Sequence, residues 1–246
     1  MKKISFLLIL SSFVLMIVSL IFVSAVPAEN YDYGVIVFNE AKLGAHVDSN
    51  VYAKIVHGAI QVDPSKTLYC SNNEQTNAKK GTFSQDELDE MYDYFKSFLN
   101  INIDYSMSKS ALEDASMTFN IQLDENEIIF IKISSDTTNI KTKFTVNGAV
   151  VPDYSEIAGR VYWLYEGNSS LRLNSDCFFG ILIAPDADVF VEGCGNYDGT
   201  IVCNNLTTSN EVHQIKRQEP ETSTTTSITS ISTSQTTVTT PETTPT

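Results

Sequence analysis

Two short stretches of this chain hold residue types that could do chemistry. Asp186 and Asp188 lie two residues apart, and so do Glu211 and His213. Two carboxylates can act together on a sugar when the pKa of one of them is raised, and their oxygens can also bind calcium. A glutamate beside a histidine can transfer protons or bind a metal ion. Each of these chemistries needs further partners, which the surrounding sequence must supply.

The aspartate pair follows Ala184 and Pro185, and this context is typical of a turn. Proline cannot donate a ladder hydrogen bond and therefore belongs at a turn, a bulge or the edge of a sheet. An aspartate at such a place can bond its own backbone in an Asx-turn. The sequence has no DxDxDG loop, which would favour calcium. We therefore predict a corner of the fold at Ala184-Pro185-Asp186-Ala187 and no catalytic pair.

Residues two apart on a strand point to the same face, so Glu211 and His213 are expected side by side. Acid–base chemistry and metal binding stay open as interpretations. We can assign them no third ligand and no nucleophile from the sequence, which favours a hydrogen bond that closes the last coil of the fold. Since no convincing catalytic constellation is found, we predict a protein that is not an enzyme and uses no cofactor.

The elements that must position these residues are mostly short strands. Residues 82–99 predict an amphipathic helix, because apolar residues recur at helical spacing and Ser84 and Glu87 fit a capping box. A second helix is expected at residues 106–115. The expected strands are residues 33–38, 47–56, 59–62, 116–123, 128–133, 143–147, 161–165, 170–173, 180–183, 188–191 and 200–203.

A local pattern recurs along the chain. Residues 47–53, 157–163 and 197–203 share an apolar or aromatic residue, then Asp or Ala, then Gly or Ser, and later two apolar positions. Residues 180–184 can also be aligned with residues 199–203, at an offset of 19 residues. Repeats of this size are typical of stacked β-solenoid coils, in which each coil buries its face on the next.

The clearest of these stretches resemble a known family. GILIAPDADV (residues 180–189) and YDGTIVCNNLTTSNEVH (residues 197–213) are similar to motifs of the choice-of-anchor A family, a domain of secreted bacterial and fungal surface proteins. Residues 31–53, 144–151 and 161–167 resemble further motifs of that family. The chain departs from the family pattern at Asn39, Glu40, Ser49, Leu164, Tyr165 and Asn210.

The resemblance implies both a fold and a role. The fold is mainly β, a right-handed β-helix (a β-solenoid of the ice-binding-like type) with an α-helix packed alongside, and the role is adhesion at a cell surface. The family-motif residues are Ala184, Pro185, Asp186, Ala187, Gly199, Glu211 and His213. Ice binding itself is not expected, because ice faces of solenoids carry regular ranks of threonine and the threonines of the folded part are scattered.

The two ends of the chain predict export. Residues 1–25 read as a signal peptide, although their apolar run is also long enough to span a bilayer uncleaved. Residues 216–246 are rich in Thr and Ser and predict a disordered tail, either an O-glycosylated stalk or a bare one. Lys216-Arg217 at its start is either a processing site or a solvated linker. The folded domain is therefore expected at residues 29–215.

Cysteines and sequons fit this location. The four cysteines are Cys70, Cys177, Cys194 and Cys203. Their even number in a secreted chain predicts two disulfides, and their spacing does not fit a zinc site. Asn168 and Asn205 begin N-x-[ST] sequons and are candidates for N-glycosylation in a eukaryotic host.

These features predict a secreted or cell-surface, wall-associated adhesive domain that binds a surface or glycan without catalysis. The alternatives are a polysaccharide-active β-helix enzyme and a purely structural wall protein. A formal net charge of −14 argues against nucleic acid as a partner, and membrane contact is expected only through an uncleaved signal segment. The cluster of Tyr162, Trp163 and Tyr165 is expected to lie half in the core, with a carbohydrate platform as the alternative.

Overall fold

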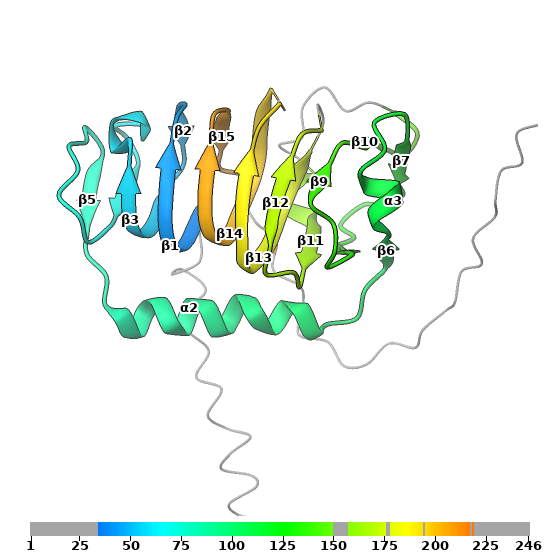
Figure 1. The fold of residues 1–246 in the computed structure, drawn as a ribbon, viewed down its shortest axis with the longest axis horizontal. Coiled ribbons are helices and arrows are strands. Elements are labelled where there is room, and N and C mark those ends of the chain that lie inside the picture. The colour runs from blue at the N-terminus through cyan, green and yellow to red at the C-terminus, as the bar shows by residue number, and fades with distance from the viewer. Residues whose placement is uncertain (1–33, 150–156, 176–177, 194, 217, 219–246) are drawn as a thin grey trace, which may run out of the picture.

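The structure, a computed structural model, describes residues 34–149, 157–175, 178–193, 195–216 and 218. They form mainly strands, with one long helix beside them (Figure 1). The strands are β1 (Val35–Leu43), β2 (Val47–Asp48), β3 (Val51–His57), β4 (Thr67–Tyr69), β5 (Lys79–Gly81), β6 (Tyr105–Met107), β7 (Thr118–Ile121), β8 (Ile129–Ile133), β9 (Asn139–Ile140), β10 (Lys143–Val146), β11 (Val161–Tyr165), β12 (Ser170–Leu173), β13 (Phe179–Val191), β14 (Asn196–Thr208) and β15 (Glu211–His213). The helices are α2 (Gln85–Ser97), α3 (Lys109–Leu112) and the 3-10 turns η2 (Ala59–Gln61), η3 (Phe98–Asn100) and η4 (Ala158–Arg160).

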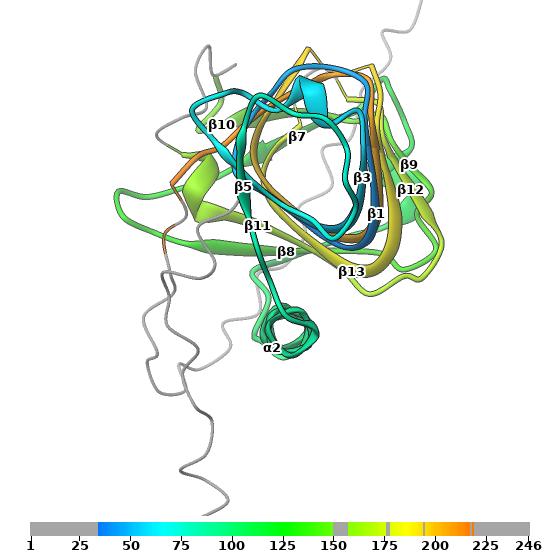
Figure 2. The same cartoon turned by 90° about the vertical axis from the view of Figure 1, so that its left-hand side faces the viewer.

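The strands wind into coils. A 13-stranded sheet has the order β5-β4-β3-β1-β14-β13-β11-β8-β6, with β12, β9, β15 and β2 paired off this path. Its named ladders are parallel, which is the pairing that results when each turn of a coil lies on the one before it. Figure 2 shows the coils end-on. Apolar side chains fill the interior that the coils enclose. The fold is therefore mainly β and β-helix-like, as predicted.

The order of the coils differs from the order of the sequence. The chain enters in the middle, at β1, and winds outward through β3, β4 and β5. Helix α2 then runs along the coils to the opposite end, where β6 begins (Figure 1). From there β8, β11, β13 and β14 wind back until β14 pairs with β1. The two parts of the chain thus meet at the β1–β14 ladder, which joins residues far apart in the sequence.

The predicted internal register is confirmed in part. Gly180 pairs with Gly199 and Ala184 with Cys203, the offset of 19 residues expected from the sequence. Residues 47–53 and 197–203 are also equivalent, because Val35 pairs with both Val51 and Ile201. The copy at residues 157–163 is displaced by two positions: Trp163 pairs with Leu182, which pairs with Ile201.

The close contact between two glycines explains why this register is fixed. Gly199 has φ 153° and Gly180 has φ 104°, both in the region that favours glycine. A Cβ atom on Gly199 would lie 1.8 Å from the carbonyl oxygen of Gly180. The hydroxyl of buried Tyr197 donates to the same oxygen at 2.9 Å. Neither glycine leaves room for a side chain, so the coils can stack here only in this alignment.

Helix α2 forms where its pattern predicted it. Ser84 and Glu87 make the expected capping box, and Leu88, Met91 and Phe95 are buried. They pack on the outward side chains of the strands beneath, a surface we call the helix-covered face: Ile36, Tyr52, Tyr162, Leu164, Ile181, Ile183 and Val202. Strands buried on both sides read as continuous apolar runs, which is the pattern of this part of the sequence.

The helix also corrects the prediction for the aromatic cluster. Tyr162, Trp163 and Tyr165 are all fully buried. Tyr162 points outward but is stacked against Phe98 beside α2, with ring centroids 5.7 Å apart. Trp163 points inward and donates to the carbonyl of Phe179 at 2.6 Å. A carbohydrate platform of these three side chains is therefore wrong, because α2 covers the outward side of the sheet.

Several predicted boundaries are wrong. The strand expected at residues 59–62 is the 3-10 turn η2, and the helix expected at residues 106–115 is strand β6 followed by the single turn α3. The strands expected at residues 180–183 and 188–191 are one strand, β13. Its register shifts between Ala184 and Asp188, so the Ala-Pro-Asp corner is a bulge within a long strand.

The prediction of two disulfides is wrong at Cys70 and Cys203, which are free. Cys203 pairs with Val37 of β1, and Val37 pairs with Ala53 of β3. Cys70 follows β4, the next strand along the sheet. Three strand spacings amount to roughly 14 Å, whereas a disulfide requires Cα atoms within about 7 Å. Burial raises the pKa of both thiols, and Cys203 is fully buried, whereas Cys70 is partly exposed.

Some predictions lie outside the described residues. These are the signal peptide at residues 1–25, the tail beyond Gln218 and the cysteines Cys177 and Cys194. Within the described part of the chain, no helix is long and apolar enough to cross a membrane.

Candidate functional site

Asp186 holds the helix to the coils. Its carboxylate accepts hydrogen bonds from the hydroxyl of Tyr92 and, at 3.1 Å, from the ammonium of Lys96. Partial burial opposes ionisation, but these two bonds and the positive charge of Lys96 hold the pKa of Asp186 below its ordinary value of 3.8. The Asx-turn suggested by the sequence is thus replaced by contacts to α2, residues that lie far away in the chain.

Asp188 has different partners and faces another element. Its Oδ1 atom accepts from the side-chain amide of Asn205 at 2.7 Å. Asp186 and Asp188 are therefore not a pair: one bonds to the helix and the other to the neighbouring coil. The lowered pKa of Asp186 is also the opposite of what a general acid requires. This arrangement offers no catalytic carboxylate pair at the corner.

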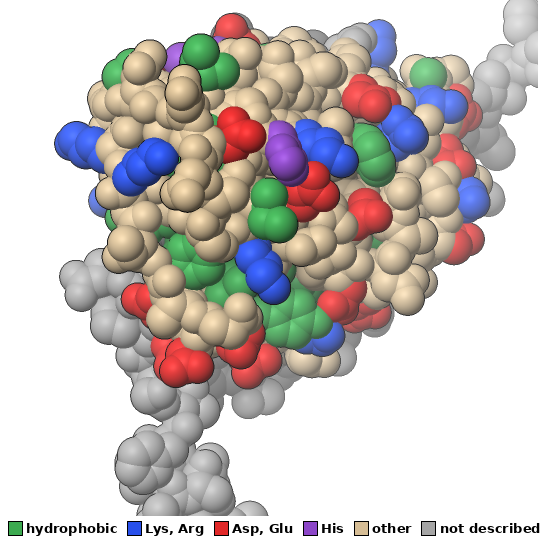
Figure 3. All heavy atoms as spheres, turned by 60° about the vertical axis from the view of Figure 1, so that its left-hand side comes forward, with side chains coloured by type: hydrophobic (Ala, Val, Ile, Leu, Met, Phe, Trp, Pro, Cys, Tyr) green, Lys and Arg blue, Asp and Glu red, His purple; other side chains and the backbone are tan. Residues whose placement is uncertain are grey.

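Asp188 belongs to a second surface, which no helix of the described residues covers and which we call the open face. Its side chains alternate with buried ones along β9, β12 and the second halves of β13, β14, β1 and β3. Two ranks run across the coils: Ser170, Asp188, Asn205, Glu40 and Ile55, and beside them Asn139, Arg172, Phe190, Thr207, Lys42 and His57. In Figure 3, acidic, basic, histidine and hydrophobic side chains lie intermixed on the surface that contains this face.

A groove of about 250 Å³ lies between the two ranks, bordered by Asn39, Glu40, Lys42, Asp188, Phe190, Asn205 and Thr207. Asn205 is at its centre. Its carbonyl oxygen accepts from the side-chain amide of Asn39 at 2.9 Å and from the backbone N–H of Glu40 at 3.1 Å. Its NH₂ group donates to Asp188. One amide therefore ties β13, β14 and β1 together beneath the groove.

Charged side chains of the open face pair with one another. His57 Nε2 lies 2.8 Å from a carboxylate oxygen of Glu40, and Lys42 lies 3.5 Å from the same oxygen. Arg172 is 2.7 Å from Glu192 and also lies over the ring of Phe190, 4.5 Å from its centroid. Exposed pairs contribute little to stability. On the open face, Lys42 and Arg172 each lie beside an opposite charge.

The two sequons differ in their surroundings. Asn168 is exposed beyond the end of β11. Asn205 is partly buried, and both polar atoms of its amide already make the hydrogen bonds of the groove. The nitrogen that would carry a glycan is the one that donates to Asp188.

Glu211 and His213 lie on a different side of the coil, on β15. They point to the same side, with 3.5 Å between His213 Nε2 and Glu211. His213 Nδ1 lies 3.0 Å from Asp198 on the neighbouring strand β14. This contact between coils supports the structural interpretation of the motif. Among the described His, Cys, Asp and Glu residues, no group of three or more is arranged to hold a metal ion.

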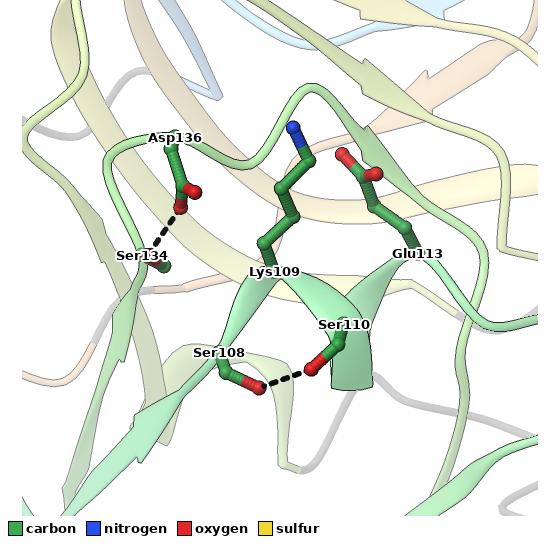
Figure 4. A pocket seen from close by; sticks show the side chains of 6 residues that line it. All are labelled: Ser108, Lys109, Ser110, Glu113, Ser134 and Asp136. Atoms are coloured by element: carbon green, nitrogen blue, oxygen red, sulfur yellow. Dashed lines mark hydrogen bonds between the residues drawn. The ribbon is translucent and has the colours of Figure 1, made fainter.

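A second hollow lies around α3, lined by Ser108, Lys109, Ser110, Glu113, Ser134 and Asp136 (Figure 4). Its polar side chains other than Lys109 make local hydrogen bonds. Glu113 accepts from the backbone and the hydroxyl of Thr138, and although burial opposes ionisation, these bonds lower its pKa. Ser134 donates to Asp136 at 2.5 Å. The hollow is broad and shallow, and its groups serve the fold.

Sequence reasoning missed most residues of the open face, among them Glu40, Lys42, His57, Arg172 and Phe190. The available signal was period-two alternation: in β1 and β12, polar residues alternate with buried apolar ones. Alternation tells which residues point outward on each strand. It does not tell which strands are neighbours, and the open face combines strands from both parts of the chain.

Residues 96–214 match the family model described as "Putative Ice-binding-like adhesive domain". Among solved structures, the chain is similar to an ice-binding protein from the Antarctic ascomycete Antarctomyces psychrotrophicus, with 13% identity, a TM-score of 0.47, and coverage of 77% of this chain and 97% of that chain. No curated protein matches the chain. The family match includes the C-terminal coils β8–β15 and supports an adhesive-like, surface-binding domain.

Proposed function

We propose that this protein is a non-catalytic adhesive domain that binds a glycan-bearing surface through its open face. The observation that carries the proposal is the difference between the outward surfaces of the coils. One is apolar and covered by α2, whereas the open face is polar, uncovered in the described structure and contains the groove around Asn205. The match of residues 96–214 to an adhesive domain family supports the same role.

The proposal extends to the ends of the chain. We propose that residues 1–25 direct secretion, that residues 29–215 form the adhesive domain and that residues 216–246 present it on a stalk outside the cell or in the cell wall. Coils are taken as right-handed, because parallel crossover connections almost always have that hand. Membership in the choice-of-anchor A family stays a prediction based on the motifs quoted above.

The absence of catalysis in this proposal rests on how the acids are used. Asp186 binds α2 with a lowered pKa, Asp188 and Glu40 bond to groups of the open face, and Asp198 contacts His213. A polysaccharide-active enzyme would need one carboxyl group with a raised pKa facing a second one. The acids named here serve as anchors between neighbouring elements. Asp104, whose pKa is raised by burial and by the charge of Glu127, accepts a hydrogen bond from the backbone N–H of Phe130 at 2.7 Å.

The direct test is retention of the purified chain on insoluble glycans and whole cell walls, with and without calcium. We expect saturable retention on at least one surface, by a protein whose circular dichroism shows the folded state. Equal, unsaturable retention on all surfaces would contradict adhesion and favour a structural wall protein. Release of reducing sugar from any of the glycans would contradict the non-catalytic role and favour the enzyme.

A further inference from the structure

We propose that the open face binds a linear, uncharged polysaccharide that lies along the axis of the coils, with one sugar unit in the groove around Asn205. The inference rests on the proposed adhesive function and specifies the ligand and its direction. It follows from the spacing of the side chains, their chemistry, their charge and their fixed positions.

The spacing favours a polymer that runs along the axis. Asp188, Asn205 and Glu40 come from three successive strands, and each occupies the same outward position of its coil. Neighbouring strands are about 4.8 Å apart. A pyranose ring in an extended chain advances by a similar length, so successive sugars along such a chain meet one polar side chain each. A polymer across the coils would instead pass from the open face onto the next surface.

The chemistry of the groove matches sugar hydroxyl groups. A hydroxyl both donates and accepts hydrogen bonds, and the groove offers carboxylate acceptors on Asp188 and Glu40 beside the ammonium donor of Lys42. Oδ2 of Asp188 has no partner among the described residues, whereas Oδ1 is occupied by Asn205. The ring of Phe190, one side of which is covered by Arg172, adds apolar surface at the border of the groove.

The charge of the face favours an uncharged ligand. The two ranks contain two acids, Asp188 and Glu40, and two permanent cations, Arg172 and Lys42, so their formal charges cancel. The rest of the molecule is strongly acidic, with −14 for the whole chain. A polymer of uronic acids is negatively charged, so the acidic molecule would repel it. The open face has no net positive charge that would attract such a polymer.

The groove is held ready for binding. Asn205 uses three hydrogen bonds to fix Asp188, Asn39 and the backbone at Glu40. Side chains that are already ordered lose little conformational entropy when a ligand binds. Replacement of this amide therefore affects affinity through the arrangement of the groove.

The test uses the full chain and measures binding isotherms on cellulose and chitin, with polygalacturonate and a branched mannan as comparison polymers. We expect saturable binding to cellulose or chitin, and affinity for soluble cello- or chito-oligosaccharides that rises with length from two to six units. The variants are Asn205→Asp, which places a second carboxylate beside Asp188, and Thr207→Arg, which fills the groove from an outward position. Glu211→Gln on β15 is the matched control for a change of one charge.

Both open-face variants are expected to weaken binding at least tenfold, and Glu211→Gln is expected to bind normally. The thermal unfolding midpoint of Thr207→Arg should stay close to that of the unchanged chain, whereas Asn205→Asp, which loses the hydrogen bond to Asp188, should have a lower one. Thr207→Arg keeps the test decisive if Asn205→Asp fails to fold. Preference for polygalacturonate or mannan, affinity independent of oligosaccharide length, or full binding by both variants would overturn the inference and leave adhesion standing. If the chain is retained neither on any of these polymers nor on whole cell walls, the proposed function itself is refuted.

Discussion

The helix-covered face and the open face share four strands, β1, β3, β13 and β14, yet their outward side chains differ in kind. In β13, Ile181 and Ile183 point to α2 and are buried, whereas Asp188 and Phe190 point outward from the open face. The change occurs within one strand, at the bulge that contains Pro185. In the proposed function, stability and binding are thereby assigned to separate surfaces of one set of coils.

This difference implies that the two faces respond differently to the same substitution. The first face loses packing when a side chain is shortened, since α2 and the sheet bury it from both sides. A shortened side chain on the open face removes proposed contacts to a ligand, while the core of the coils beneath it stays intact.

Phe95→Ala in α2 and Phe190→Ala on the open face make the same chemical change on the two surfaces. Phe95 is 0% exposed, so its truncation should lower the free energy of unfolding by about 3–5 kcal/mol. Phe190 is only partly buried, and its truncation should cost less than about 1 kcal/mol. Denaturant unfolding measures both. Equal losses from the two variants would contradict the division between the faces.

The contact of Asp186 with α2 gives a smaller, pH-dependent effect. Asp186→Asn should lower the free energy of unfolding by about 0.2–1 kcal/mol near neutral pH, because the contact is partly exposed. The pKa of Asp186 is lower in the folded state than its ordinary 3.8, so the stabilisation is present above that pH and disappears as the pH falls through the lower folded value. Urea unfolding at several pH values measures it. A difference between the two proteins that does not shrink in acid would contradict the role of the charge.

The helix cap, the pair of glycines and the contact of Asp186 with α2 show what the sequence could and could not predict. The helix with its Ser84–Glu87 capping box, and the offset between Gly180 and Gly199, follow from patterns within a few residues or from a repeat. The partners of Asp186 could not be found this way, because Tyr92 lies 94 residues away. Its bond to Asp186 depends on α2 crossing the coils after β5, a feature of topology.

The open face was missed for a related reason. Its outward residues are visible as alternation in each strand, but β1 and β14 become neighbours only because the chain starts in the middle of the coils. The groove around Asn205 needs Asn39 from one part of the chain and Asp188 from the other. The free state of Cys203 depends on the same coil order, which separates it from Cys70.

Glycosylation should distinguish the open face from the edge of the coils. When a eukaryotic host secretes the chain, we expect higher glycan occupancy at Asn168, which is exposed, than at Asn205, whose NH₂ group donates to Asp188. Mass spectrometry of the glycopeptides measures both sites. Full occupancy at Asn205 in a protein that still binds its surface would contradict the arrangement of the groove.

The smallest expected effect concerns ice. The outward ranks of the open face contain one threonine, Thr207, among charged and amide side chains. Ordered threonine ranks are absent from this face, so we expect no thermal hysteresis and no shaping of ice crystals by the chain. Nanolitre osmometry measures both. A measurable freezing gap that Thr207→Arg abolishes would show that the open face binds ice.

The most direct test of the account asks where the bound surface lies. Lysine acetylation of the folded chain, free and bound to whole cell walls, compares Lys42 on the open face with Lys79 on β5 and Lys143 on β10, all of which are exposed. We predict that binding slows the acetylation of Lys42 at least fivefold and leaves the other two unchanged. Unchanged labelling of Lys42 in the bound state, or protection of Lys143 in its place, would contradict the claim that the open face is the adhesive surface.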